Sequence, residues 1–139
     1  DDWLERMTAY GIDVILPIPL YVAPSLETNY KRRHDPLDWD HMMQYLKSNH
    51  EEDYWKARRF FQGNLYSPCN MFVMRRKVLD DLCTWLFPIL DEITELGGQK
   101  EDTYLNRYPG FISERLITFF FYMHQKKYKI VYADKNFLP

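Results

Sequence analysis

The sequence contains only two cysteines and five glycines, and it lacks the patterns that these residues build in common functional sites. Cys69 and Cys83 stand in apolar surroundings and give neither a disulfide framework nor a metal-ligand spacing. We expect both to be buried small hydrophobic residues in a reducing compartment. There is no Gly-rich phosphate loop and no nucleophile elbow, and the four histidines are scattered. The sequence therefore predicts no metal site and no cofactor within this chain.

The chain also lacks an excess of charge of either sign and a long hydrophobic run. Its 18 basic and 20 acidic residues give a net charge of −2, which argues against a nucleic-acid partner. The one basic run, residues 31–34, is followed at once by Asp35 and Asp38, as expected at the end of a helix. The strongly apolar stretch at 116–123 is far shorter than the roughly 20 residues that a bilayer span needs. We expect no transmembrane segment.

Aromatic side chains, in contrast, are abundant. They make up 17% of the 139 residues, which is more than the core of one domain of this size can hide. Tyr and Trp combine an apolar face with a polar group, so some of them are expected to line a groove or an interface. The chain begins with Asp1-Asp2 rather than Met, so we expect residues 1–139 to form a single domain that is a piece of something longer.

Hydrophobic periodicity and capping residues predict strands alternating with helices. Asp35-Pro36 is a helix start signal, and Gly97-Gly98 is a helix stop signal. The predicted helices cover residues 3–7, 26–34, 36–49, 51–61 and 76–96, and the predicted strands cover 13–16, 70–74 and 129–133. The segments 17–24 and 99–108 are predicted to be loops. This alternation indicates an α/β fold.

The chain is organised around the stretch from Pro109 to Leu116. Pro109 and Gly110 are predicted to end the preceding segment, and a helix is predicted to begin at about 111–113. Glu114 and Arg115 would then fall in the first turn, where the helix dipole favours an ionised carboxylate. This is a suitable place to hold a substrate hydroxyl group. The alternative, in which Glu114 only complements the dipole and Arg115 only pairs with a surface acid, remains open.

Three other kinds of side chain are candidates for a site. Asn70 opens a predicted buried strand, where its polar atoms need partners from a neighbouring loop or from a ligand. Arg107 lies in the predicted loop before the central helix, where it could simply face solvent. His34 and the other histidines are expected at the surface or at helix ends, and His124 could reach the site only through the fold.

Three sequence blocks, in this order, resemble a known family. They are Tyr66-Ser67-Pro68-Cys69-Asn70-Met71-Phe72-Val73-Met74, then Trp85-Leu86-Phe87-Pro88-Ile89-Leu90, then Arg107 with Gly110-Phe111-Ile112-Ser113-Glu114-Arg115-Leu116. The segments 13–17 and 30–34 fit the same pattern. The match covers essentially the whole chain. It resembles the C-terminal part of a bacterial family of glycosyltransferase-like domains in capsular and exopolysaccharide biosynthesis proteins, domain of unknown function 4422.

The resemblance implies a GT-A-like α/β architecture with few strands packed against helices. It implies that Glu114 is the acceptor-side carboxylate and that Asn70 contacts sugar. It further implies substrate or phosphate contacts for the remaining candidates, which are Arg107, Arg115, His34 and Tyr30. It also implies that the nucleotide-binding first strands belong to an N-terminal part of the same domain, which we expect to lie outside this sequence. Asp38-Trp39-Asp40 has the spacing of a metal-binding Asp-x-Asp motif but falls on a predicted helix, so a divalent metal in the full-length protein is left open.

The expected function is transfer of a sugar from a nucleotide-sugar donor to a glycan acceptor in capsular or exopolysaccharide biosynthesis. The expected location is the cytoplasm, and peripheral association with the inner face of the membrane is left open. A different class of function is a non-catalytic module that binds glycan or protein through its surplus aromatic side chains. An enzyme requires Glu114 and Asn70 on one cleft, whereas a binding module requires exposed Tyr and Trp side chains in a patch away from them.

Overall fold

The computed structural model describes residues 3–68 and 71–134, which form a small sheet packed against helices. The helices are α1 (Trp3–Tyr10), α2 (Leu26–Arg33), α3 (Pro36–Asn49), α4 (Glu51–Phe60), α5 (Arg76–Gly97) and α6 (Tyr108–Met123), with a short 3-10 helix η1 at Leu105–Arg107. The strands are β1 (Val14–Pro17), β2 (Leu20–Tyr21), β3 (Leu65–Tyr66), β4 (Val73–Met74) and β5 (Ile130–Ala133). The predicted α/β fold class is confirmed.

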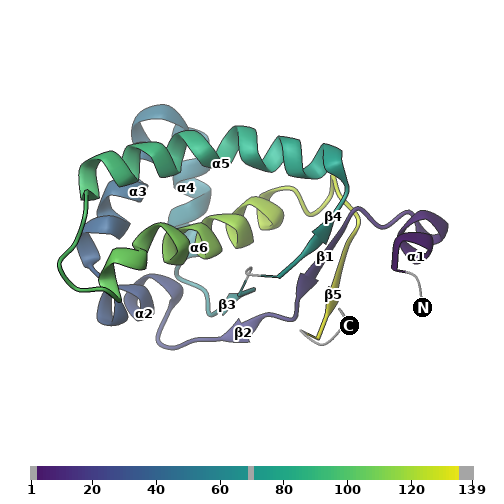
Figure 1. Ribbon diagram of the computed structural model, residues 1–139, viewed down its shortest axis with the longest axis horizontal. Helices are drawn as coiled ribbons and strands as arrows, with labels where there is room; N and C mark the ends of the chain where they lie inside the picture. The colour runs from purple at the N-terminus through teal and green to yellow at the C-terminus, as the bar shows by residue number, and fades with distance from the viewer. Residues whose placement is uncertain (1–2, 69–70, 135–139) are drawn as a thin grey trace.

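The main sheet has three strands in the order β4-β1-β5 (Figure 1). β1 runs parallel to β5, with Val14 opposite Ile130, and antiparallel to β4, with Val14 opposite Met74. Every residue of β1 is buried, as expected for a central strand. The strands predicted at 13–16 and 129–133 are therefore confirmed. In the region predicted as strand at 70–74, the described residues form a strand only at Val73–Met74.

Side chains of β1 alternate between two hydrophobic clusters, because neighbouring residues of a strand point to opposite faces of a sheet. Val14 and Leu16 join the main core between the sheet and the helices. Ile15 faces the other way and packs with Met7 of α1 and Ile12 in a smaller cluster. Helix α1 therefore covers the face of the sheet opposite the main helical layer.

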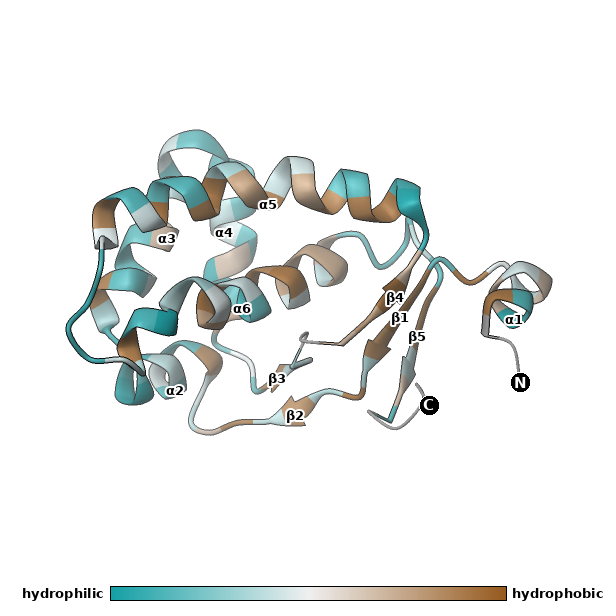
Figure 2. Ribbon diagram, in the orientation of Figure 1, coloured by the Kyte–Doolittle hydropathy of each residue, from teal (hydrophilic) through white to brown (hydrophobic). Residues whose placement is uncertain are grey.

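Helix α6 runs through the middle of the helical layer, with α5 alongside it (Figure 1). Hydrophobic residues predominate in the later turns of α6 and in β1 and β4 (Figure 2). The buried side chains of α6 are Tyr108, Ile112, Arg115, Leu116, Ile117, Phe119, Phe120 and Phe121. Helices α3, α4 and α5 and strand β3 all contact α6, which makes it the central element of the main core.

The start predicted for α6 is wrong. The helix begins at Tyr108, with Pro109 in its first turn and Gly110 inside it. Proline suits this position because its fixed backbone angle fits a helix and the N–H that it lacks would have no partner there. Pro109 therefore starts the helix instead of separating it from what precedes it. The segments predicted as loops at 17–24 and 99–108 also contain regular structure, in β2 and η1.

Helix α5 ends where the sequence predicts, and a close approach explains its last residue. A Cβ atom on Gly97 would lie only 2.8 Å from the Tyr108 hydroxyl oxygen. That hydroxyl group donates a hydrogen bond of 2.7 Å to the Gly98 carbonyl oxygen. The end of α5 is thus fixed on the first residue of α6, and Gly97 permits this contact.

We expect Gly97→Ala to lower the free energy of unfolding by about 1–3 kcal/mol, because the buried Tyr108 ring must move to accept the new methyl group. Gly110→Ala is the matched control. It lies inside α6 with open space where a Cβ would stand, so it should stabilise the protein by about 0.5–1 kcal/mol. Urea denaturation measures both values. Equal effects of the two substitutions would contradict the proposed role of the close contact.

Candidate functional site

The most unusual side chain of α6 is Arg115, which is buried with only 3% of its surface exposed. Its guanidinium carbon lies 4.5 Å from the ring centre of Tyr66 and 5.3 Å from that of Tyr30. One terminal nitrogen donates a hydrogen bond of 3.1 Å to the Phe111 carbonyl oxygen. The alternative that Arg115 only pairs with a surface acid is wrong, because the side chain is held inside the protein between two aromatic rings.

Tyr30 and His34 face Arg115 from helix α2. They stand four residues apart, which places them on one face of the helix, with ring centres 4.6 Å apart. The His34 ring also stacks on Phe111 at 4.2 Å and on Tyr104 at 5.6 Å. This cluster joins α2 to the first turn of α6. His34 caps the end of α2, so it lies at a helix end, one of the two places expected for it, and it is buried there.

The electrostatics of the cluster keep both α2 side chains neutral. Burial, and then the nearby positive charge of Arg115, lowers the pKa of His34 from 6.5 to about 4. Burial, with the negative charge of Asp38, raises the pKa of Tyr30 far above its usual value. Arg115 therefore carries its positive charge beside two uncharged rings near neutral pH.

A second buried charged group lies at the start of α3. Asp38 is fully buried, and its Oδ1 atom lies 3.2 Å from Lys100 Nζ. The same ammonium group donates to Asp35 Oδ2 at 2.9 Å and stands 4.7 Å from the Tyr108 ring centre. These contacts fix the segment after α5 onto the start of α3. Asp38 lies on a helix, as predicted, and serves this ion pair.

Glu114 lies in the second turn of α6, not in the first, because the helix begins at Tyr108. The expected support from the helix dipole is therefore wrong, since that effect falls off within the first turn. The side chain of Glu114 is half-buried. One turn further along, Thr118 Oγ1 lies 3.1 Å from the Ser67 carbonyl oxygen and accepts from the Ser67 backbone N–H at 3.2 Å. The segment that follows β3 is thus fixed to α6 close to Glu114.

Thr118 and Ser67 also line a hollow of about 180 Å³, which we call the aromatic pocket. Its other lining residues are Pro19, Phe60, Leu65, Tyr66, Phe121, Tyr122, Gln125 and Tyr132. Tyr122 and Tyr132 are about half exposed. The pocket is smaller than the roughly 300–1,000 Å³ typical of a whole small-molecule site, so it suits one ring of a ligand.

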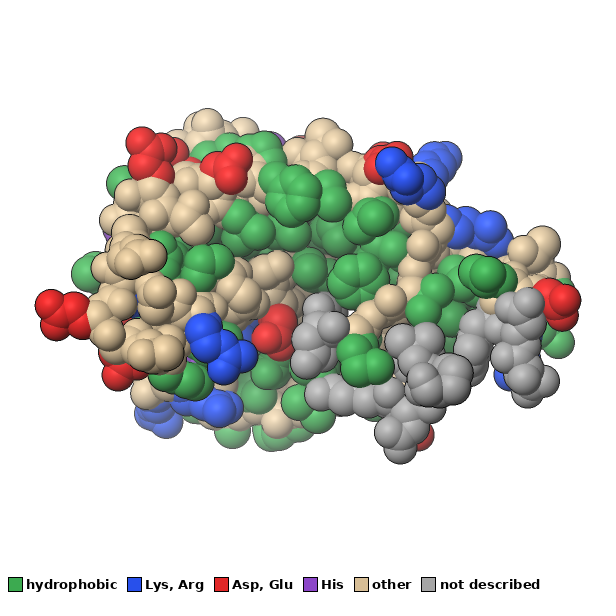
Figure 3. All heavy atoms as spheres, in the orientation of Figure 1, with side chains coloured by type: hydrophobic (Ala, Val, Ile, Leu, Met, Phe, Trp, Pro, Cys, Tyr) green, Lys and Arg blue, Asp and Glu red, His purple; other side chains and the backbone are tan. Residues whose placement is uncertain are grey.

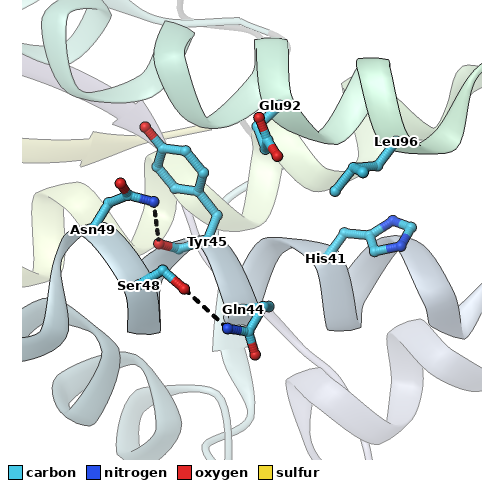
Figure 4. Close-up of a pocket in the computed structure, with 7 residues that line it drawn as sticks. All are labelled: His41, Gln44, Tyr45, Ser48, Asn49, Glu92 and Leu96. Atoms are coloured by element: carbon cyan, nitrogen blue, oxygen red, sulfur yellow. Dashed lines mark hydrogen bonds between the residues drawn. The ribbon is translucent and has the colours of Figure 1, made fainter.

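A larger hollow of about 340 Å³ lies between α3 and α5 (Figure 4). Its lining is polar at His41, Gln44 and Glu92, and it includes none of the predicted site residues that the structure describes. Ser48 accepts a hydrogen bond from the Gln44 side chain, and Asn49 donates one to the Tyr45 carbonyl oxygen. Both bonds stay within α3, and the buried His41 Nδ1 atom has no hydrogen-bond partner among the residues that the structure describes.

The structure brings together four of the six predicted site residues. Tyr30, His34 and Arg115 are in contact, and the exposed Arg107 lies 5.5 Å from the ring centre of Phe111 in the same cluster. Glu114 is adjacent in sequence to Arg115 but faces the Thr118 side of the helix. Asn70 lies outside the described residues.

Sequence reasoning missed three aromatic residues of this cluster. Tyr66 lies against the Arg115 guanidinium, whereas Phe111 and Tyr104 stack on His34. The three rings come from separate segments, and only the fold brings them together. The sequence offers two signals of this cluster, which are the four-residue spacings of Tyr30 with His34 and of Phe111 with Arg115. Each spacing indicates that two side chains share one face of a helix. Neither indicates that the two helix faces meet.

Two further findings concern the described residues 3–68 and 71–134. No group of three or more His, Cys, Asp or Glu side chains there could hold a metal ion. None of the helices in these ranges is long and apolar enough to cross a membrane.

The described helices and strands define an α/β domain. The chain belongs to the family described as domain of unknown function (DUF4422), whose model matches residues 4–127. The apo structure of the bifunctional glycosyltransferase WbbM is similar in fold, with a TM-score of 0.76 and 22% sequence identity. The similarity covers 96% of this chain but only 26% of the WbbM chain. A comparison with curated proteins finds no match.

The neutral His34 predicts a specific pH dependence of stability. Its pKa is 6.5 when unperturbed and about 4 in the folded protein, so the unfolded state binds more protons between these values. Stability should therefore fall as the pH is lowered from 6.5 towards 4, with His34 contributing about 2 kcal/mol of loss by pH 5. Urea denaturation at pH 7 and pH 5 should show this loss in the parent and a smaller one in His34→Gln. An identical loss in both proteins would contradict the prediction.

Proposed function

We propose that this chain is part of a glycosyltransferase that moves a sugar from a nucleotide-sugar donor to a glycan acceptor. The observation that supports it best is the place of Glu114 in a fold shared with WbbM. The carboxylate is half-buried on α6, and the next turn of this helix lines an aromatic pocket open to a ligand. A carboxylate next to an aromatic hollow is suited to a sugar hydroxyl group, because the ring faces cover the apolar side of the sugar.

In this proposal Glu114 is the general base. Its carboxylate takes the proton from the acceptor hydroxyl group while that oxygen forms a bond to the anomeric carbon of the donor. The bond from the anomeric carbon to the nucleotide diphosphate breaks, and the diphosphate leaves with the electron pair. Asn70 is proposed to contact sugar. Arg107, which is exposed, is proposed to meet a phosphate group of the substrate.

The buried members of the cluster have a different part in the proposal. Arg115 is buried in the second turn of α6, so its positive charge lies inside the domain, beside Glu114 in the sequence. Tyr30 and His34 hold the guanidinium group in position with uncharged rings. We propose that these three residues position the site and add to its positive potential towards a substrate phosphate.

We further propose that residues 1–139 are the C-terminal part of a longer glycosyltransferase domain in capsular or exopolysaccharide biosynthesis. Hydrophobic side chains gather between α5 and α6 and towards β4 on the face in Figure 3, with charged side chains mostly around them. Phe87 of α5 is about half exposed. The N-terminal part of the domain, with the nucleotide-binding strands, is proposed to pack there, on the cytoplasmic side of the membrane. Any divalent metal would be bound by that part.

The catalytic role of Glu114 has a direct test in the full-length protein. Glu114→Gln keeps the shape of the side chain but removes the base, so we expect turnover of nucleotide sugar to fall by about 10²–10⁴-fold with little change in KM. Glu92→Gln is the matched control, because Glu92 lines the separate hollow between α3 and α5. Its turnover should stay at the parent rate. The measurement is sugar transfer, or nucleotide-sugar hydrolysis, at saturating donor.

Two outcomes would contradict the proposed catalytic role of Glu114. If Glu114→Gln transfers sugar at the parent rate, the base is elsewhere. If the parent binds glycan but shows no turnover with any nucleotide sugar, the binding module becomes the better function. The exposed Tyr122 and Tyr132 rings would then be its ligand contacts.

A further inference from the structure

A second hollow, of about 360 Å³, lies where α4 meets the end of α6, and we call it the basic pocket. It is lined by Lys56 and Arg59 from α4, by Tyr122 and Met123 at the end of α6, and by Gln125 and Lys126 from the following turn. Three of these six side chains are positively charged and none is negative. Such a concentration of positive charge is notable in a chain with a net charge of −2.

The cations of the basic pocket are available to a ligand. Lys56 forms an ion pair of 3.7 Å with Glu52, but both side chains are exposed and 88% of Glu52 is in solvent. A surface pair of this kind contributes little and is easily exchanged. Arg59 and Lys126 are also exposed. Converging positive charges of this kind attract a group with concentrated negative charge, such as a phosphate.

The basic pocket adjoins the aromatic pocket. Tyr122 and Gln125 line both hollows, so the two meet at these side chains. The Tyr122 ring packs on Phe60 at 4.6 Å between ring centres, which fixes its orientation. A ligand with a ring in the aromatic pocket therefore has the basic pocket directly beside it.

We propose that the basic pocket binds the phosphate group of a phosphorylated saccharide whose sugar ring lies in the aromatic pocket. Lys56, Arg59 and Lys126 contact the phosphate oxygens, and Tyr122 contacts the sugar. The concave shape and the shared lining favour such a ligand over the flat surface of an anionic membrane. Binding requires no transfer of sugar, so the proposal can hold whether or not Glu114 is catalytic.

The test uses glucose 1-phosphate as the probe and isothermal titration calorimetry on the full-length protein. The double variant Lys56→Gln/Lys126→Gln should bind the probe about tenfold more weakly, which corresponds to about 1.4 kcal/mol. The matched control is Lys47→Gln/Lys77→Gln, which removes the same charge from exposed positions on α3 and α5 outside either pocket. It should bind the probe as the parent does. Raised salt should weaken the parent's binding.

A third variant tests the contact with the sugar separately from the contact with the phosphate group. Tyr122→Ala should weaken binding of glucose 1-phosphate but leave binding of inorganic phosphate unchanged, since it removes the contact with the sugar only. Equal affinity of the two double variants for glucose 1-phosphate would overturn the proposal. So would binding to phosphatidylglycerol vesicles that depends on Lys56 and Lys126 with no binding of glucose 1-phosphate. That result would make the basic pocket a membrane-contact surface.

Discussion

The burial of α6 on nearly every side is the constraint on which the rest of the structure depends. Three successive residues, Arg115, Leu116 and Ile117, are all buried. At about 100° per residue they already cover most of the circumference of the helix. The next turn repeats this with Phe119, Phe120 and Phe121. Only a narrow strip of α6 is therefore left for partly exposed polar side chains, and that strip holds Glu114, Thr118 and Tyr122 at four-residue spacing.

The same constraint explains the surroundings of Arg115, the one charged residue on the buried faces. A buried charge without compensation is costly, and here two tyrosine rings and one backbone carbonyl group surround the guanidinium. A protonated His34 would add a second positive charge next to it. The depressed pKa of His34 avoids this near neutral pH. The cluster therefore contains one positive charge, on Arg115, near neutral pH, and it holds α2 against the start of α6.

The sequence predicts the parts of this arrangement that depend on local signals. Asp35-Pro36 starts α3, Gly97-Gly98 ends α5, and the β-branched run at 13–16 is the central strand. The start of α6 was predicted wrongly because a proline such as Pro109 can either end one helix or stand in the first turn of the next. The local sequence does not decide between these two positions. The two-residue strands β2 and β3 were missed because they are too short to show a period of two.

The candidate site was predicted less completely, since its members meet only through long-range packing. The family resemblance points to Tyr30, His34, Arg107 and Arg115, and the fold brings all four to the junction of α2 and α6. No local pattern indicates that Arg115 is buried, or that Tyr66 of β3 covers it. The basic pocket has no sequence signature at all, because Arg59 and Lys126 are distant in sequence and belong to separate elements.

The distribution of cations along α6 limits how a substrate can lie on this domain. Arg115 and Lys100 are enclosed by protein groups, so a negatively charged substrate must be met by exposed cations. Among the exposed cations, Arg107 stands before the first turn of α6 and Lys126 stands beyond its last turn. The 16 residues of α6 span about 24 Å at 1.5 Å per residue. One phosphate group cannot reach both ends, so the phosphate proposed at Arg107 and the phosphate proposed in the basic pocket must be two separate groups.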